Sequence, residues 1–66
     1  MIDDLPENLR KTILSLLKLG EATAQDIARI TGRNRSTESY YLNMLTQMRI
    51  LKKRKIGRKI YFSINS

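Results

Sequence analysis

The side chains with the most distinctive chemistry lie between residues 35 and 49, where hydroxyl, amide and phenol groups recur at helical spacing. Ser36, Ser39, Tyr40 and Asn43 project from one side of the helix that this spacing predicts. That side carries no Lys or Glu, the usual solubilising residues of an exposed helix. Hydroxyl and amide groups form hydrogen bonds with base edges and phosphates. The pattern therefore predicts a helix face suited to a groove of a nucleic acid.

Charge is unevenly distributed along the chain. Residues 1–32 carry four cations against five acids, a net charge of −1, and residues 33–66 carry nine cations against one acid, a net charge of +8. This segregation indicates a polyanionic partner, bound by neutralisation of phosphates and release of counterions. A basic surface that only solubilises the domain is the alternative. An anionic membrane is less favoured, because the basic half has no long amphipathic helix with a basic polar face.

The composition argues against catalysis and against metal binding. The chain has no Cys, no His and six acids, so no triad, paired carboxylates or metal site is expected. We therefore expect no enzyme, no metal and no cofactor. The lack of Cys fits a cytoplasmic protein, and no apolar run approaches the roughly 20 residues of a membrane span. The start, Met1 to Asp4, is acidic, whereas the start of a signal peptide is basic. The composition suits a nucleoid-associated protein of prokaryotic, archaeal or viral source.

A chain of 66 residues has room for one domain, residues 1–66. A domain this small buries only about 60% of the surface that its unfolded chain exposes, so its core is marginal. Because a disulfide and a bound metal are not expected, self-association is the remaining way to add stability. The first helix is expected at 5–19, with Asp4 as its cap and Pro6 in its first turn. Its apolar face comprises Leu5, Leu9, Ile13, Leu16 and Leu17. Leu14 and Leu19 lie off this face and are expected to contact a second copy in a homodimer.

Two more helices and a hairpin are expected after Gly20. A helix at 24–31 begins with Thr23 as its cap and Asp26 three residues later, and a brief strand at Glu21 and Ala22 is possible before it. The third helix runs from 35 to 49. Leu51–Ile56 and Lys59–Ile64 alternate as strands around a tight turn at Gly57. The apolar sides comprise Ile27, Ala28 and Ile30 in the second helix, Tyr41, Leu42, Leu45 and Met48 in the third, and Ile60, Phe62 and Ile64 in the last strand.

The order of these elements, together with particular residues, resembles a known family. Residues 24–32, Ser36-Thr37, Tyr41-Leu42, Leu45, Ile50-Leu51 and residues 57–64 are similar to winged helix-turn-helix regulators of the ArsR and MarR type. The resemblance covers residues 10–64. It implies a mainly α fold with a small β-hairpin (α+β), that is, three helices and a two- or three-stranded wing. It also implies a homodimeric transcriptional regulator that binds double-stranded DNA, and no small-molecule effector is evident.

The resemblance also implies which residues contact the duplex. The third helix would enter the major groove, where Arg35 can pair with guanine and Asn43 with adenine, each pair discriminating by roughly 1–3 kcal/mol. The implied recognition residues are Asn34, Arg35, Ser36, Ser39, Tyr40 and Asn43. The implied backbone and wing contacts are Thr23, Arg33, Lys52, Lys53, Arg54, Lys55, Gly57, Arg58 and Lys59.

Several alternatives stay open at this point. Ser36 can cap the third helix, Tyr40 can pack against the hairpin, and Arg58 and Lys59 can merely solubilise the turn. Glu38 stands where the family usually has an apolar residue, and it can pair with Arg33 or Arg35 or accept a hydrogen bond from cytosine. Arg49 replaces a common glycine, so the exit turn differs or Arg49 touches a phosphate. An architectural DNA-binding protein and a protein-interaction module are the competing functions.

Overall fold

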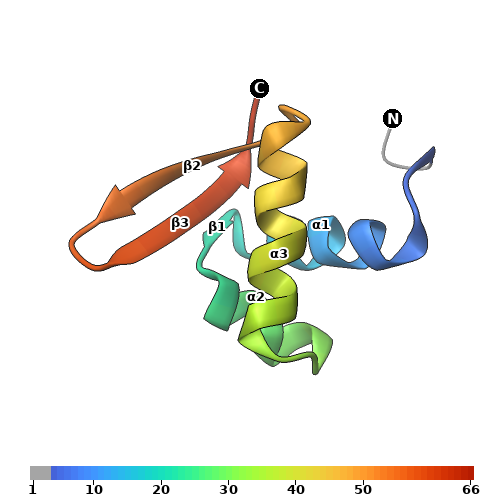
Figure 1. Ribbon diagram of the computed structural model, residues 1–66, viewed down its shortest axis with the longest axis horizontal. Helices are drawn as coiled ribbons and strands as arrows, with labels where there is room; N and C mark the ends of the chain where they lie inside the picture. Colours follow the sequence, from blue (N-terminus) through green and yellow to red (C-terminus); the bar gives the residue numbers. More distant parts are fainter. Residues whose placement is uncertain (1–3) are drawn as a thin grey trace.

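The computed structural model describes residues 4–66 and contains three helices and a three-stranded antiparallel sheet (Figure 1). Residues 1–3, which belong to the start predicted to be acidic, lie outside the described part. The elements are α1 (Glu7–Leu19), β1 (Glu21–Ala22), α2 (Ala24–Thr31), α3 (Arg35–Gln47), β2 (Leu51–Ile56) and β3 (Lys59–Ile64). The predicted fold class is confirmed, as are the bounds of α2 and of all three strands. No helix within residues 4–66 is long and apolar enough to cross a membrane.

The sheet has the order β1-β3-β2, and only its base is three strands wide. β1 pairs Glu21 with Ser63 and Ala22 with Phe62. β2 pairs with β3 along its whole length, from Leu51 opposite Ile64 to Ile56 opposite Lys59. Between Phe62 and the turn at Gly57 the sheet therefore contains only β2 and β3. This two-stranded ribbon, the wing, extends away from the helices on the left of Figure 1.

The core lies where the three helices meet the inner face of the sheet. It comprises Leu9, Ile13 and Leu16 of α1, Ile27 of α2, Leu42 and Leu45 of α3, and Ala22, Leu51 and Phe62 of the sheet. The centres of the predicted apolar faces are thus confirmed. The prediction is wrong at the edges of these faces, where four residues are exposed instead of buried. These are Leu17, Ile30, Met48 and Ile60, each between 41% and 49% exposed. These four lie at the margins of their faces, where a core this small has no further element to cover them.

The starts of α1 and α2 differ in whether a side chain caps their free backbone N–H groups. α1 begins at Glu7 rather than residue 5, Pro6 occupies the cap position, and no side chain caps the helix, so the prediction of Asp4 as cap is wrong. A proline disfavours the helical conformation in the residue before it, which excludes Leu5 from the helix. α2 begins as predicted: Thr23 Oγ1 accepts from the Asp26 N–H at 3.2 Å, and Asp26 Oδ2 accepts from the Thr23 N–H at 3.1 Å.

The start and end of α3 are set by residues with unexpected roles. Asn34 caps the helix, because its Oδ1 accepts from the Thr37 N–H at 2.8 Å, so the alternative of Ser36 as cap is wrong. α3 ends at Gln47 rather than residue 49, and Arg49 adopts a left-handed conformation with φ of 64°. The N–H groups of Arg49 and Ile50 donate to the carbonyls of Thr46 and Leu45, both at 3.0 Å. These two bonds form the turn that normally uses glycine.

We expect Arg49→Gly to stabilise the domain. A left-handed conformation costs a residue with a Cβ about 1–2 kcal/mol, and part of the gain is offset by the larger entropy of glycine in the unfolded chain. The free energy of unfolding should rise by about 0.5–1 kcal/mol, a shift of roughly 2–8 °C in Tm by thermal denaturation. Arg49→Ala removes the same charge but keeps the backbone cost, so it is the control. An equal gain from alanine would contradict this explanation.

Candidate nucleic-acid interface

A groove lies between the start of α2, the exposed side of α3 and the wing. Its volume is about 440 Å³. Six residues predicted to contact DNA line it, although they come from three separate parts of the chain: Thr23, Arg35, Ser39, Asn43, Arg58 and Lys59. Ala24, Gln25, Asp26, Arg29, Ile60 and Phe62 complete the lining. The structure thus brings α2, α3 and the wing to one surface.

Two polar groove residues, Gln25 and Arg29, were missed by the sequence analysis. They stand four residues apart on α2, and this spacing places them on the same side of a helix. Both are exposed. Their spacing of four residues along the predicted helix was the signal in the sequence that could have placed them on one side of α2.

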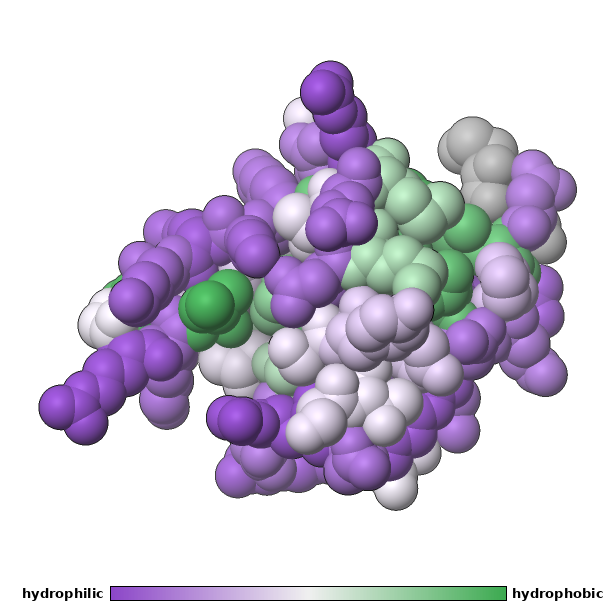
Figure 2. Space-filling view, in the orientation of Figure 1, coloured by the Kyte–Doolittle hydropathy of each residue, from purple (hydrophilic) through white to green (hydrophobic). Residues whose placement is uncertain are grey.

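The groove is strongly cationic. Arg29, Arg35, Arg58 and Lys59 line it, and Asp26 is the one acid among its lining residues. The Asp26 carboxylate accepts a hydrogen bond from the Thr23 N–H within the cap of α2. All four cations are exposed, so they are available to an anion. Figure 2 shows strongly hydrophilic side chains along the wing beside the weakly polar surface over α3.

The outer surface of α3 adds three predicted residues that do not line the groove. Asn34, Ser36 and Tyr40 are all exposed. Tyr40 is 63% exposed, and its ring lies 5.8 Å from that of Tyr41. The alternative that Tyr40 packs against the hairpin is therefore wrong. This surface continues the groove along the first half of α3.

Asn43 and Lys53 are joined across α3 and β2. Lys53 Nζ donates to Asn43 Oδ1 at 2.8 Å, and Asn43 Nδ2 donates to the Ser39 carbonyl at 2.9 Å. Both ends of the Asn43 amide are thus engaged within the chain. An amide has two N–H donors and two lone pairs on its oxygen, so the expected pairing of Asn43 with adenine stays a prediction. In this arrangement Asn43 positions the wing against α3.

The four consecutive cations of β2 do not form one surface. Successive strand residues point to opposite faces, so Lys53 and Lys55 share the face of Phe62, whereas Lys52 and Arg54 point to the other face. Lys52, Lys53, Arg54 and Lys55 therefore cannot all follow one DNA backbone as expected. Gly57 forms the wing turn with φ of 62°.

Arg54 is engaged by an acid on the far face of the sheet. Its Nε and Nη2 donate to the two carboxylate oxygens of Glu21, both at 2.8 Å. This hydrogen bonding lowers the pKa of Glu21 below its ordinary value and raises the pKa of Arg54. The pair joins β1 to β2 across β3.

Arg33, predicted as a DNA contact, is held inside the domain instead. Its Nη1 donates to Glu38 Oε2 at 3.1 Å, Thr12 Oγ1 at 3.1 Å and the Asn8 carbonyl at 3.2 Å. Its guanidinium carbon also lies 5.1 Å from the centre of the Tyr41 ring. Arg33 lies in the turn between α2 and α3, and its side chain is directed back towards α1. Its role as a DNA contact therefore stays a prediction, and its observed role is to pair with Glu38.

Glu38 is the acceptor at the centre of this network. It is fully buried, and the hydroxyls of Thr12 and Thr31 donate to its two oxygens at 2.7 Å each. Of the alternatives for Glu38, pairing with Arg33 is confirmed, while pairing with Arg35 and a bond to cytosine are wrong. A buried carboxylate is tolerated only when charge and hydrogen bonds satisfy it.

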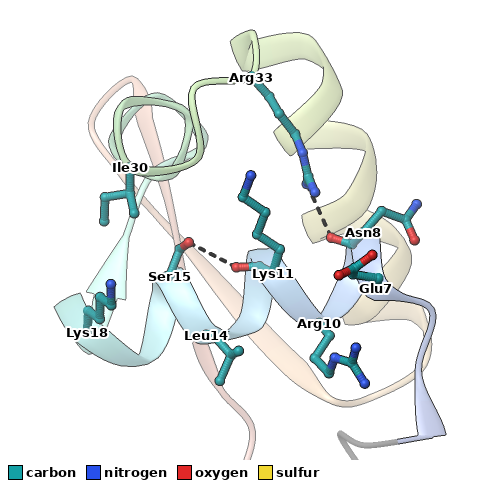
Figure 3. A pocket seen from close by; sticks show the side chains of 9 residues that line it. All are labelled: Glu7, Asn8, Arg10, Lys11, Leu14, Ser15, Lys18, Ile30 and Arg33. Carbon is teal, nitrogen blue, oxygen red and sulfur yellow. Dashed lines mark hydrogen bonds between the residues drawn. The ribbon is translucent and has the colours of Figure 1, made fainter.

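A second hollow, of about 1040 Å³, lies along α1 and the end of α2 (Figure 3). Leu14 and Ile30 contribute its apolar side chains. Leu14 and Leu19 are 51% and 47% exposed, as expected of interface residues, but five residues separate them by about 140° around the helix. Leu17, three residues from Leu14 and 49% exposed, is the neighbour on the same side. The two leucines of the prediction thus do not form one patch.

Comparison with known proteins identifies the family of the chain. Residues 8–53 match the family model of the bacterial regulatory proteins of the arsR family. The chain belongs to the ArsR family. This family consists of transcriptional regulators rather than enzymes, so the predicted class is confirmed. The winged helix-turn-helix fold follows from the same match and from the structural similarity below.

Individual relatives agree with the family assignment. An uncharacterized protein of Archaeoglobus fulgidus is 67% identical over the whole chain, which covers 89% of that protein. The transcriptional repressor SdpR of Bacillus subtilis is 39% identical over 57 residues, 86% of this chain and 63% of SdpR. The homodimeric winged helix-turn-helix DNA-binding domain Mb0332 of Mycobacterium bovis has a TM-score of 0.76 and 33% identity, over 91% of this chain and 56% of that one. The chain thus spans little more than half the length of some of its relatives.

We predict that Arg33 is needed to neutralise the buried carboxylate of Glu38. Arg33→Met leaves a buried carboxylate without its cation, which should lower the free energy of unfolding by about 3 kcal/mol or more in urea denaturation. Arg33→Met combined with Glu38→Leu removes both charges and should recover much of that loss. Arg35→Met makes the same chemical change at an exposed position and should alter stability by no more than about 0.5 kcal/mol. Equal losses in Arg33→Met and the double variant would contradict the prediction.

Proposed function

We propose that this ArsR-family protein binds double-stranded DNA with sequence preference, placing α3 in the major groove and the wing on the adjacent minor groove or its phosphates. The observation that carries the proposal is the cationic groove that joins α2, α3 and the wing. Its charge and its position between α3 and the wing suit one sugar–phosphate strand running between the two grooves of a duplex. The family assignment supports a DNA-binding regulator of this kind.

The residues divide into those that read bases and those that hold the backbone. Arg35 and Ser39 lie at the start of α3, the part of a recognition helix that reaches base edges in helix-turn-helix proteins. Arg29, Arg58 and Lys59 flank them and would contact phosphates. Exposed Asn34, Ser36 and Tyr40 extend the base-facing surface. Asn43 and Lys53 would fix the angle between helix and wing.

A homodimer would place two α3 helices in successive major grooves. Leu14 and Leu17 form an exposed apolar pair on the outer side of α1, and burying such a pair against a second copy would supplement a small core. The homodimeric state of Mb0332 supports this proposal. An architectural protein that binds any duplex is the second candidate, supported by the excess of cations over free base-reading groups.

We expect duplex affinity to fall steeply with salt, and Arg58→Ala to reduce the slope of log K against log salt by about 1. Arg54→Ala is the matched control, because Arg54 is paired with Glu21 on the far face and its loss should leave the slope unchanged. Fluorescence anisotropy over a range of salt concentrations measures both. A salt-independent affinity for the unmodified protein would overturn DNA binding through this surface.

Selection of bound duplexes from a random pool separates the two candidates. A recovered consensus with two half-sites one helical turn apart supports the sequence-specific dimer. Equal affinity for selected and random duplexes would assign the protein to the architectural class. Arg35→Ala should then weaken binding to the consensus by roughly 1–3 kcal/mol while changing random-duplex binding much less.

For the dimer we expect Leu14→Glu to give monomers. A carboxylate buried between two α1 helices costs several kcal/mol without a partner, so the variant should dissociate in sedimentation equilibrium. Leu19→Glu is the control, since Leu19 is equally exposed but lies on another side of α1. A dimer that persists in Leu14→Glu and is lost in Leu19→Glu would place the interface elsewhere.

A further inference from the structure

The tip of the wing carries two exposed isoleucines that the proposed contacts do not use. Ile56 is 49% exposed and Ile60 is 42% exposed. Ile56 lies opposite Lys59, and Ile60 lies opposite Lys55. Successive register pairs point to alternate faces, so one isoleucine stands on each face of the ribbon. The wing thus ends in an apolar side chain on both faces.

These isoleucines do not serve the fold of the ribbon. Neither belongs to the core or to the partly buried residues packed against it. Threonine has a similar preference for strands, so a polar residue would form the same hairpin. An exposed isoleucine gains free energy only if another molecule covers it.

The charge around the tip indicates what that molecule is. Lys55, Arg58 and Lys59 surround the two isoleucines, and residues 55–60 contain no acid. A second wing would set cations against cations, so the tip is unsuited to self-association. A polyanion with apolar surface between its charges complements it, and the minor groove of DNA has this character, with sugars and base edges between two phosphate strands.

The position of Ile60 favours DNA over other polyanions. Ile60 lines the same groove as Arg35, Ser39, Arg58 and Lys59. A duplex held by α3 would therefore lie next to the wing tip. The minor groove of B-DNA is about 6 Å wide, whereas a two-stranded ribbon has strands about 4.8 Å apart and side chains on both faces. The tip can enter only if the groove widens.

We infer that the wing tip is an apolar wedge, in which Ile60 and Ile56 enter the minor groove between Arg58, Lys59 and Lys55 and bend the duplex. Apolar side chains that enter a minor groove partly unstack a base step and kink the duplex by about 20–90° towards the major groove. The cations hold the phosphates on either side while the isoleucines contact sugars and base edges. The inference rests on the proposed DNA binding and adds a deformation of the bound DNA.

The test compares the unmodified protein with the double variant Ile56→Thr and Ile60→Thr. Both changes keep the strand preference and every charge. The end-to-end distance of a selected duplex, dye-labelled at both ends, is measured by energy transfer, and affinity is measured over a range of salt concentrations. We expect the unmodified protein to bend the duplex, and the variant to bend it less and to bind about tenfold more weakly with an unchanged salt slope. Leu19→Thr removes a similarly exposed apolar side chain that lies off the proposed dimer surface of α1 and should leave bend and affinity unchanged.

The outcomes separate this inference from the proposed function. Binding with equal bend angles for the unmodified protein and the double variant would overturn the wedge and leave DNA binding intact. Failure of the unmodified protein to bind any duplex would overturn both. Sedimentation with phosphatidylglycerol vesicles tests the remaining partner: vesicle binding that the double variant loses, without a change in DNA bending, would assign the tip to a lipid surface and overturn the wedge.

Discussion

The arrangement of the three helices depends on the buried carboxylate of Glu38. Its two oxygens accept from Thr12 in α1, from Thr31 at the end of α2 and from Arg33 in the turn that follows. One side chain of α3 is therefore bonded to every other helical part of the domain. Apolar packing alone tolerates small rotations of one helix against another, whereas four hydrogen-bonding groups directed at or from one buried carboxylate do not. The orientation of α3, and of whatever α3 contacts, follows from this network.

A second constraint, the alternation of a β-strand, divides the cations of the wing. β2 carries four cations in succession, yet Lys53 and Lys55 face the side of α3 while Lys52 and Arg54 face away. On the far face Glu21 pairs with Arg54, whereas on the near face Lys53 bonds to Asn43, which lines the cationic groove. Charge density along the sequence thus overstates the charge of the surface that a partner meets. Glu38 in the core and Glu21 on the far face of the sheet each pair with one arginine that sequence reasoning had assigned to DNA.

Local rules predicted most of the fold. The capping residues of α2, the glycine turn of the wing and the period-2 pattern of the strands depend on neighbours in sequence, and each was predicted correctly. Pro6 and Arg49 shifted the ends of α1 and α3 because a residue's own backbone restriction outweighed the apolar periodicity. The roles of Arg33, Asn43 and Arg54 could not be predicted in this way. Their partners stand 5 to 33 residues distant, and only the packed fold selects them. The sequence placed Glu38 beside apolar residues and offered Arg33, Arg35 and cytosine as its partners, but local rules could not choose among them.

The uneven charge makes the two ends of the molecule electrically different. Figure 1 shows the wing and the start of α1 at opposite ends of the long axis, which extends over 34 Å. The wing end holds Lys55, Arg58 and Lys59 without an acid, whereas Asp4 and Glu7 lie at the other end beside Arg10 and Lys11. The centre of charge is thus displaced from the centre of mass, and the molecule has a permanent electric moment along its length. The field of a polyanion would exert a torque on this moment and would turn the domain with its wing foremost before contact.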